Sequence, residues 1–439
     1  MNSEVLGVAL LFVALAVSRK NGGAALGILI SSMLVFPEFV RVPFGIVQMS
    51  VPRFVAIFLL VKFMSKGRHR ITHFGKADAL AILLWAWTIF ATILANAETH
   101  QVTQMIGRGL DTVLMYFVAR LAFVNREDIY GLFGPLALTA IVMCVAGSYE
   151  AVTWTSPYQV YTLGNLRIYD YQEVRYGLLR AQASTLTSIY FGMAMMLVSG
   201  LIWSIRGYVN SRFAFRIFLV AALVAVLSSL SSGPWIAIAT LIGINLFFTR
   251  LNLIKPALGL LLLLIVFLEI ASNRHFYNLI DHLALDSETA WYRTRLLEIA
   301  VSQWRDYWII GVGSNWPNYW AQLLDGRRYI DVVNNFIIIA LFGGLPALFM
   351  YLSFHVIAIR RSIAAFQADD DIARRKLLFG LAATLLTLDF SSMSVGLFGP
   401  ALALSFILVG MMISVATAWR KDQGVDLVAD QIDDLAVRR

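Results

Sequence analysis

Charged residues are scarce in this sequence: they make up only 14% of its 439 residues, whereas 59% are hydrophobic. Soluble domains carry charge on about a quarter of their residues, because charged side chains cover the surface that faces water. This composition excludes a soluble fold. The apolar residues also occur in runs of about twenty, the length that a helix needs to cross the ~30 Å hydrocarbon core of a bilayer. We therefore expect an all-α polytopic membrane protein.

Cysteine is almost absent, and the usual metal-binding and nucleotide-binding patterns are missing. Cys144 is the only cysteine, which excludes an intramolecular disulfide. It lies inside an apolar run, which argues against thiolate metal chemistry. The six histidines show no metal-ligand spacing. No Walker A loop, Gly-rich nucleotide loop or G-x-S-x-G turn occurs. We expect neither a metal ion nor an organic cofactor.

The apolar runs predict about 12 or 13 transmembrane helices, because most of them approach the length of one crossing. No internal repeat is visible, which makes an inverted-repeat transporter less attractive. The runs lie near residues 4–17, 24–40, 44–61, 78–96, 102–119, 132–153, 184–205, 214–231, 234–249, 256–272, 334–359, 376–394 and 398–418.

Basic residues are distributed unequally between the two sides of this predicted bundle. The connections rich in Lys and Arg fall on one side, which the positive-inside rule makes cytoplasmic. The two longest connections, at 154–183 and 273–333, fall on the other side and would face the periplasm in a bacterial inner membrane. The net charge of +8 therefore indicates orientation in a membrane and not nucleic-acid binding.

This pattern divides the chain into membrane and loop regions. We expect an N-terminal transmembrane bundle at 1–153, a periplasmic loop at 154–183, central transmembrane helices at 184–272, a large periplasmic loop with amphipathic helices at 273–333, C-terminal transmembrane helices at 334–418 and a cytoplasmic tail at 419–439.

Arginines gather on both predicted periplasmic segments. Arg175 and Arg180 precede a membrane span, and Arg293 and Arg295 lie on an amphipathic helix beside Trp291. A guanidinium group is always charged and binds phosphate oxygens through two parallel hydrogen bonds. The arginines therefore predict an anionic ligand reached from the outer leaflet, with aromatic rings available to stack on sugars. The alternative is that the arginines extend to the interface and that the aromatic residues form an interfacial belt.

Several charged residues lie within or beside the predicted spans. For the acids Glu150, Glu269 and Asp389, a functional role is the first hypothesis, although no proton-relay pattern links them. Arg108 and Asp111 are three residues apart and share one helix face, which favours an ion pair between them over a ligand contact.

Sequence motifs follow one another in a recognisable order over roughly residues 165–360. RYGLLRA precedes a span, SSLSSGPW begins one, WYRTRLLEIAVSQWRDYWIIGVG lies in the large loop, and VVNNFIIIALFGGLPAL closes that loop. In this order the motifs resemble those of the O-antigen polymerase/ligase superfamily of bacterial membrane glycosyltransferases. The N-terminal spans match that family only in hydropathy.

The resemblance implies a metal-independent transfer of a glycan from an undecaprenyl-pyrophosphate carrier to a sugar hydroxyl at the periplasmic face. Arginines would stabilise the charge that develops on the leaving pyrophosphate. The partners that it implies are the lipid-linked glycan, the lipid bilayer and a chain-length regulator. It implies catalytic roles for Arg180, Arg293, Asp331 and Asn334, and substrate-binding roles for Arg175, Arg295, Asn335, Glu173 and Trp291.

The chain also departs from the ligase pattern. Ligases of this superfamily carry a histidine where this sequence has Asn334, and an asparagine cannot act as a general base. Asp331 or Glu173 would have to accept the proton, or the acceptor hydroxyl attacks without full deprotonation. SSGPW also lacks an arginine that often follows the glycine. These departures favour an O-antigen or exopolysaccharide polymerase over a lipid A–core ligase, with a lipid-linked glycan transporter and a non-catalytic scaffold as further alternatives.

Overall fold

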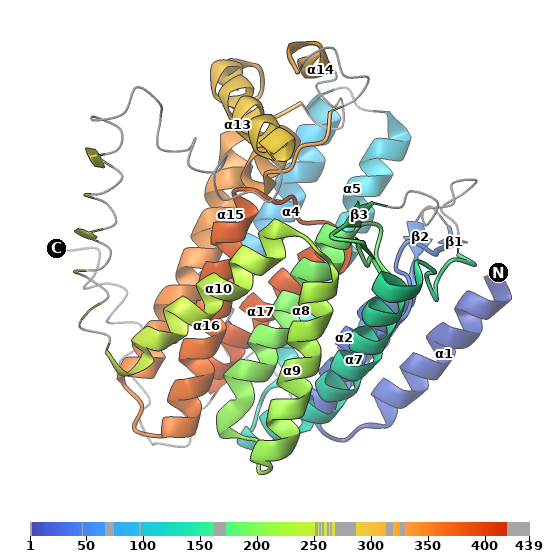
Figure 1. Ribbon diagram of the computed structural model, residues 1–439, viewed down its shortest axis with the longest axis vertical. Coiled ribbons are helices and arrows are strands. Elements are labelled where there is room, and N and C mark those ends of the chain that lie inside the picture. Colours follow the sequence, from blue (N-terminus) through green and yellow to red (C-terminus); the bar gives the residue numbers. More distant parts are fainter. Residues whose placement is uncertain are drawn as a thin grey trace.

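The computed structural model has the architecture of an all-α polytopic membrane protein (Figure 1). Two short β-ribbons are the extended structure among the described residues. Six helices within the described part of the chain are long and apolar enough to cross a membrane, namely α4, α7, α8, α10, α15 and α17, with the 3₁₀ turns that extend α8 and α10. The structure describes residues 2–45, 47–65, 74–95, 98–161, 173–250, 287–312, 319–324 and 330–418, and isolated positions between 253 and 267.

The helices follow the apolar runs of the sequence closely. Their bounds are α1 Asn2–Ser18, α2 Gly22–Val35, α3 Val51–Ser65, α4 Lys76–Leu94, α5 Thr99–Asp111, α6 Val113–Ala122, α7 Arg126–Thr153, α8 Ser188–Ser204, α9 Arg212–Ser228, α10 Ser232–Leu246, α13 Ser287–Ser302, α14 Trp320–Leu323, α15 Asn335–Gln367, α16 Ile372–Ser392 and α17 Gly399–Ala418. The ribbons are β1 Val42–Phe44 with β2 Val47–Met49, and β3 Val174–Arg175 with β4 Leu178–Leu179.

Two predicted spans differ in detail from the observed elements. The run at 44–61 begins with the β1–β2 ribbon, and its helix starts only at Val51. The run at 102–119 is two helices, because the backbone of Thr112 leaves the regular helical geometry with ψ −77°. Most of the run at 256–272 lies outside the described residues.

Helix α17 is the centre of the bundle. In its 18-residue apolar stretch, 94% is buried inside the protein. The corresponding share is 28% for α10, which presents most of its apolar surface outward. Small residues allow this close packing: a Cβ on Gly410 of α17 would lie 2.5 Å from the carbonyl oxygen of Tyr116 in α6. The outer helices therefore face lipid while α17 is enclosed by its neighbours.

A sharp break divides α15. Gly343 and Gly344 have non-helical backbone angles, and Gly344 has φ +71°. The loop after α13 docks into this break: Val312 N–H donates to the Leu341 carbonyl at 2.7 Å, and Leu345 N–H donates to the Trp308 carbonyl at 2.8 Å. Gly311 of the WIIGVG motif and the glycine pair of LFGGLP therefore lie in two segments that meet in the structure.

The break turns the start of α15 back toward its own middle. The side-chain amide of Asn335 lies 3.3 Å from the hydroxyl of Tyr351, although sixteen residues separate them. Those residues would span about 24 Å in a straight helix. Figure 1 places α13 and the β3–β4 ribbon toward the same end of the bundle, which we call the α13 end.

Candidate functional site

The β3–β4 ribbon places Glu173 and Arg180 opposite each other. Arg175 pairs with Leu178, and the intervening Tyr176 and Gly177 both have positive φ, as a two-residue hairpin turn requires. The backbone N–H of Arg180 then donates to the carbonyl of Glu173 at 2.9 Å. The local sequence thus folds two of the predicted site residues onto each other.

The guanidinium of Arg180 is held from two sides. One nitrogen forms an ion pair with the carboxylate of Glu173, and another donates to the hydroxyl of Ser231 at 2.9 Å. The Arg180 side chain is only 8% exposed, while Glu173 is 70% exposed. A cation held in this way keeps one orientation, as a group that binds a phosphate must.

The turn between α9 and α10 is the base of this arrangement. Arg175 donates to the carbonyl of Leu230 at 3.1 Å, and the backbone N–H of Ala181 donates to the carbonyl of Ser228 at 3.1 Å. Both predicted arginines of the first loop are therefore anchored on the SSLSSGPW motif. In the sequence, RYGLLRA and SSLSSGPW only follow one another in order, whereas in the structure they are in contact.

Helix α13 supports the second half of the site. The buried hydroxyl of Tyr292 donates to the carbonyl of Asp331 at 2.7 Å, and the N–H of Asp331 donates to the same hydroxyl at 2.9 Å. This double contact fixes the backbone of the DVVNN segment against α13. The neighbouring Trp291 is 39% exposed, so its ring keeps accessible surface.

The carboxylate of Asp331 remains without a hydrogen bond or ion pair among the described residues. Asp331 keeps solvent-exposed surface. Desolvation by the surrounding protein raises the pKa of Asp331 above its ordinary value, and the positive charge of Arg293 acts in the opposite direction. Arg293 is therefore near enough to Asp331 to act on it electrostatically, while the carboxylate has no hydrogen bond or ion pair within the described residues.

The other arginine of α13 has a different environment. Arg295 forms an exposed ion pair with Glu298, one helical turn further on, at 2.9 Å. Such an exposed pair contributes little to stability. The described structure does not connect Arg295 with the group around Asp331.

Asn334 and Asn335 take separate roles. The side-chain oxygen of Asn334 caps α15 by accepting from Phe336 and Ile337 at 3.0 and 3.1 Å, and its amide donates to the carbonyl of Met393 at 2.7 Å. Asn335 is fully buried and accepts from Leu397 N–H at 3.3 Å. Asn334 therefore lies at the mouth of the helix, whereas Asn335 lies inside the bundle.

The segment between α16 and α17 links the two halves of the site. The carbonyl of Met393 in this segment accepts a hydrogen bond from the side-chain amide of Asn334, and Val395 lies against Gly233 at the start of α10. Tyr190 of α8 packs on Phe398 with ring centroids 5.6 Å apart, and Asp331 lies close enough to act on Tyr190 electrostatically. The ribbon, α10, α8 and the start of α15 therefore converge at the α13 end.

Three residues in this arrangement were absent from the predicted site: Ser231, Tyr292 and Tyr190. Ser231 had a signal, because it belongs to the motif that begins a span. Tyr292 lies directly before Arg293, but helical spacing alone did not show that its hydroxyl would reach Asp331. Tyr190 could not be found from the sequence, since its neighbours come from distant segments.

The acidic residues of the spans have structural partners where they are described. Glu150 accepts the backbone N–H of Ala183 at 2.8 Å and of Gln182 at 3.3 Å, which fixes the chain just after Arg180. Asp389 lies 2.6 Å from Nδ1 of the buried His355. Glu269 lies outside the described residues.

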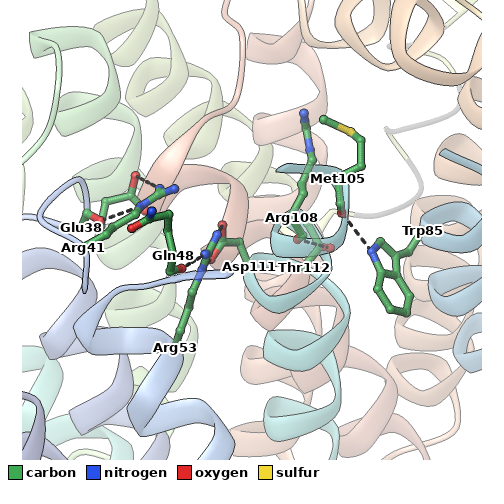
Figure 2. A network of polar contacts seen from close by, with 9 residues as sticks. All are labelled: Glu38, Arg41, Gln48, Arg53, Trp85, Met105, Arg108, Asp111 and Thr112. Carbon is green, nitrogen blue, oxygen red and sulfur yellow. Dashed lines mark hydrogen bonds and ion pairs between the residues drawn. The ribbon is translucent and has the colours of Figure 1, made fainter. Parts of the chain in front are cut away.

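The predicted pair of Arg108 and Asp111 is wrong. Asp111 instead binds Arg53 of α3, with two contacts of 2.5 and 2.7 Å, and Figure 2 shows Arg108 extending away from that pair. Neighbouring positions on one helix made the local pair plausible, but a partner from another helix offers the carboxylate a two-pronged bond.

Comparison with known proteins finds neither a family model nor a curated protein that matches this chain. Within the described segments, no group of three or more His, Cys, Asp or Glu side chains is placed to hold a metal ion. The groups gathered at the α13 end are therefore guanidinium, carboxylate, amide and hydroxyl groups. This set can bind an anion and accept a proton.

Proposed function

We propose that this protein is a metal-independent glycosyltransferase that polymerises undecaprenyl-pyrophosphate-linked oligosaccharide repeats at the periplasmic face of a bacterial inner membrane. The product would be O-antigen or exopolysaccharide. The observation that carries the proposal is the oriented guanidinium of Arg180 at the same end of the bundle as Arg293 and the uncommitted carboxylate of Asp331.

In the proposed reaction a hydroxyl of the acceptor sugar attacks the anomeric carbon of the donor glycan. The new bond joins that hydroxyl oxygen to the anomeric carbon, while the bond from this carbon to the pyrophosphate oxygen breaks. Arg180 and Arg293 stabilise the negative charge on the departing undecaprenyl pyrophosphate. The proton of the acceptor hydroxyl passes to the carboxylate of Asp331.

The positions of the other residues support their proposed roles. Glu173 and Ser231 orient Arg180, and Tyr292 orients Asp331. Arg175 adds positive charge beside Arg180, and the exposed ring of Trp291 can stack on a sugar. Asn334 uses both ends of its side chain within the protein, so it shapes the mouth of α15 and does not exchange protons.

The proposal is tested by purifying the protein into liposomes and supplying undecaprenyl-pyrophosphate-linked repeats with a chelator present. A polymerase gives a ladder of lengthening lipid-linked glycans on a gel. A parallel sample receives a lipid A–core acceptor. Transfer to that acceptor alone, without a ladder, would instead establish a ligase, and no transfer in either sample would leave a transporter or a scaffold.

A further inference from the structure

A hollow is lined by residues of α4, α5, α15 and α17. The empty space of about 510 Å³ includes the solvent at its open side, so the enclosed part of the hollow is small. We place the open side of the hollow at Trp85, Thr88, Arg108 and Phe342, because these residues are half-buried while the remaining lining residues are buried. Those buried residues are Ala81, Leu84, Met105, Thr112, Ile339, Tyr351, Leu402 and Phe406.

Arg108 is the one charged residue in this lining. The carboxylate nearest to it in sequence, Asp111, is bound by Arg53 (Figure 2). The guanidinium of Arg108 lies over the ring of Phe342, 4.6 Å from its centroid, and has no hydrogen bond or ion pair among the described residues. A cation in apolar surroundings inside a membrane bundle favours an anionic partner.

The other polar groups in the lining already have hydrogen-bond partners. The hydroxyls of Thr88 and Thr112 each donate to a carbonyl of their own helix at 2.8 Å. The indole N–H of Trp85 donates to the carbonyl of Met105 at 3.1 Å, and Tyr351 is paired with Asn335. A sugar with many hydroxyls would find few partners here. The hollow suits a ligand with one anionic group and an apolar body.

We propose that this hollow binds a phosphate-bearing lipid, with the phosphate on Arg108 and the first part of a hydrocarbon chain against Leu84, Phe342 and Phe406. Phosphate is the anion that a guanidinium binds with two parallel bonds. The half-buried side of the hollow gives such a lipid its way in. The site does not depend on the proposed glycan transfer, because its argument uses only the lining and its charge.

Native mass spectrometry of the purified full-length protein tests the site. The protein is titrated separately with phosphatidylglycerol, with phosphatidylcholine of the same chains and with undecaprenyl phosphate. The wild type is expected to bind one anionic lipid at least tenfold more tightly than phosphatidylcholine. Preference for phosphatidylglycerol would identify a bilayer lipid, and preference for undecaprenyl phosphate would identify a polyprenyl lipid.

Two variants remove the site by different means. Arg108→Gln removes the charge, and Thr88→Phe fills the open side while keeping Arg108. Each is expected to reduce the anionic preference about tenfold. The matched controls are Arg305→Gln, at an exposed arginine, and Val152→Phe, on the exposed face of α7, and both should keep the preference. Equal binding of anionic and zwitterionic lipids by the wild type, or an unchanged preference in either pocket variant, would overturn the proposal.

Discussion

At the scale of single residues, the geometry of Arg180 matters as much as its charge. A lysine keeps the charge but has no planar fork, so it cannot hold Glu173, Ser231 and a phosphate in one fixed arrangement. We expect Arg180→Lys to lower the rate of glycan transfer roughly 100-fold, the usual effect of removing one preorganised donor. Initial rates at saturating donor measure this loss. A rate within a factor of three of the wild type would show that charge alone suffices.

Asp331 gives the site a predicted pH dependence. A base acts only when it is deprotonated, and desolvation raises the pKa of Asp331 above its ordinary value of 3.8. The transfer rate should therefore rise with pH through this raised pKa and then level off. In Asp331→Asn the remaining activity should be low and should lose this rise. A pH profile of the same shape in both proteins would assign the proton to another group.

The same carboxylate should cost the fold some stability. Because the pKa is raised on folding, the folded protein holds the proton more tightly than the unfolded chain does. The contribution of this group to the free energy of unfolding is complete below 3.8, the pKa of Asp331 in the unfolded chain. It is lost as the pH rises through the pKa of Asp331 in the folded protein. At pH 7, Asp331→Asn should thus unfold at a temperature no lower than that of the wild type, which a thermal melt in detergent would show.

At the scale of elements, two glycines lock the loop after α13 into the break of α15. Gly311 and Gly344 have positive φ, and a Cβ on them would lie 2.4 Å from the Leu341 carbonyl and 2.1 Å from the Ile309 carbonyl, respectively. Backbone strain of this kind costs about 1–3 kcal/mol, and the clashes add to it. We expect Gly311→Ala and Gly344→Ala to lower the unfolding temperature and to abolish transfer together.

A matched control for these variants is Gly134→Ala in α7, where a Cβ would meet nothing within 4 Å. This change should leave the unfolding temperature unchanged or raise it, because alanine favours a helix. If Gly344→Ala behaved like Gly134→Ala, the docking of the loop into the break would not be important for stability.

Most helices could be predicted from the sequence, but most contacts between them could not. Apolar runs report which segments are helical, because burial in lipid demands about twenty apolar residues in a row. Helical spacing reports only neighbours on one helix, so it suggested Arg108 as the partner of Asp111 and missed Arg53, which is 58 residues away. The resemblance implied a substrate-binding role for Asn335, but the spacing of residues could not show that its side chain lies buried inside the bundle.

The candidate site was predictable to the extent that its motifs lie close together in sequence. Glu173 and Arg180 are seven positions apart in the sequence, and the turn residues of the ribbon lie between them. The contact of Arg180 with Ser231 crosses 51 residues, and that of Tyr292 with Asp331 crosses 39. Such contacts depend on how the helices pack, which the spacing of residues along one chain does not specify.

At the scale of the whole molecule, the proposal requires the β3–β4 ribbon to face the periplasm. Cysteine labelling tests this directly, since Cys144→Ser removes the one cysteine of the chain. In that background Tyr176→Cys lies at the 74% exposed tip of the ribbon, and Phe213→Cys lies at the 75% exposed start of α9. An impermeant maleimide should label position 176 in spheroplasts and position 213 only after lysis. The reverse labelling pattern would show that the ribbon faces the cytoplasm, on the opposite side from the lipid-linked donor, and would contradict the proposal.

The measurement that tests the central claim most directly compares four proteins in the liposome assay. Wild type, Arg180→Ala, Arg293→Ala and the exposed control Arg305→Ala receive the same undecaprenyl-pyrophosphate-linked repeats. We predict a glycan ladder from wild type and Arg305→Ala, and a loss of at least 100-fold in the other two while they remain folded. A ladder that survives in both Arg180→Ala and Arg293→Ala would contradict the claim that these arginines bind the leaving pyrophosphate.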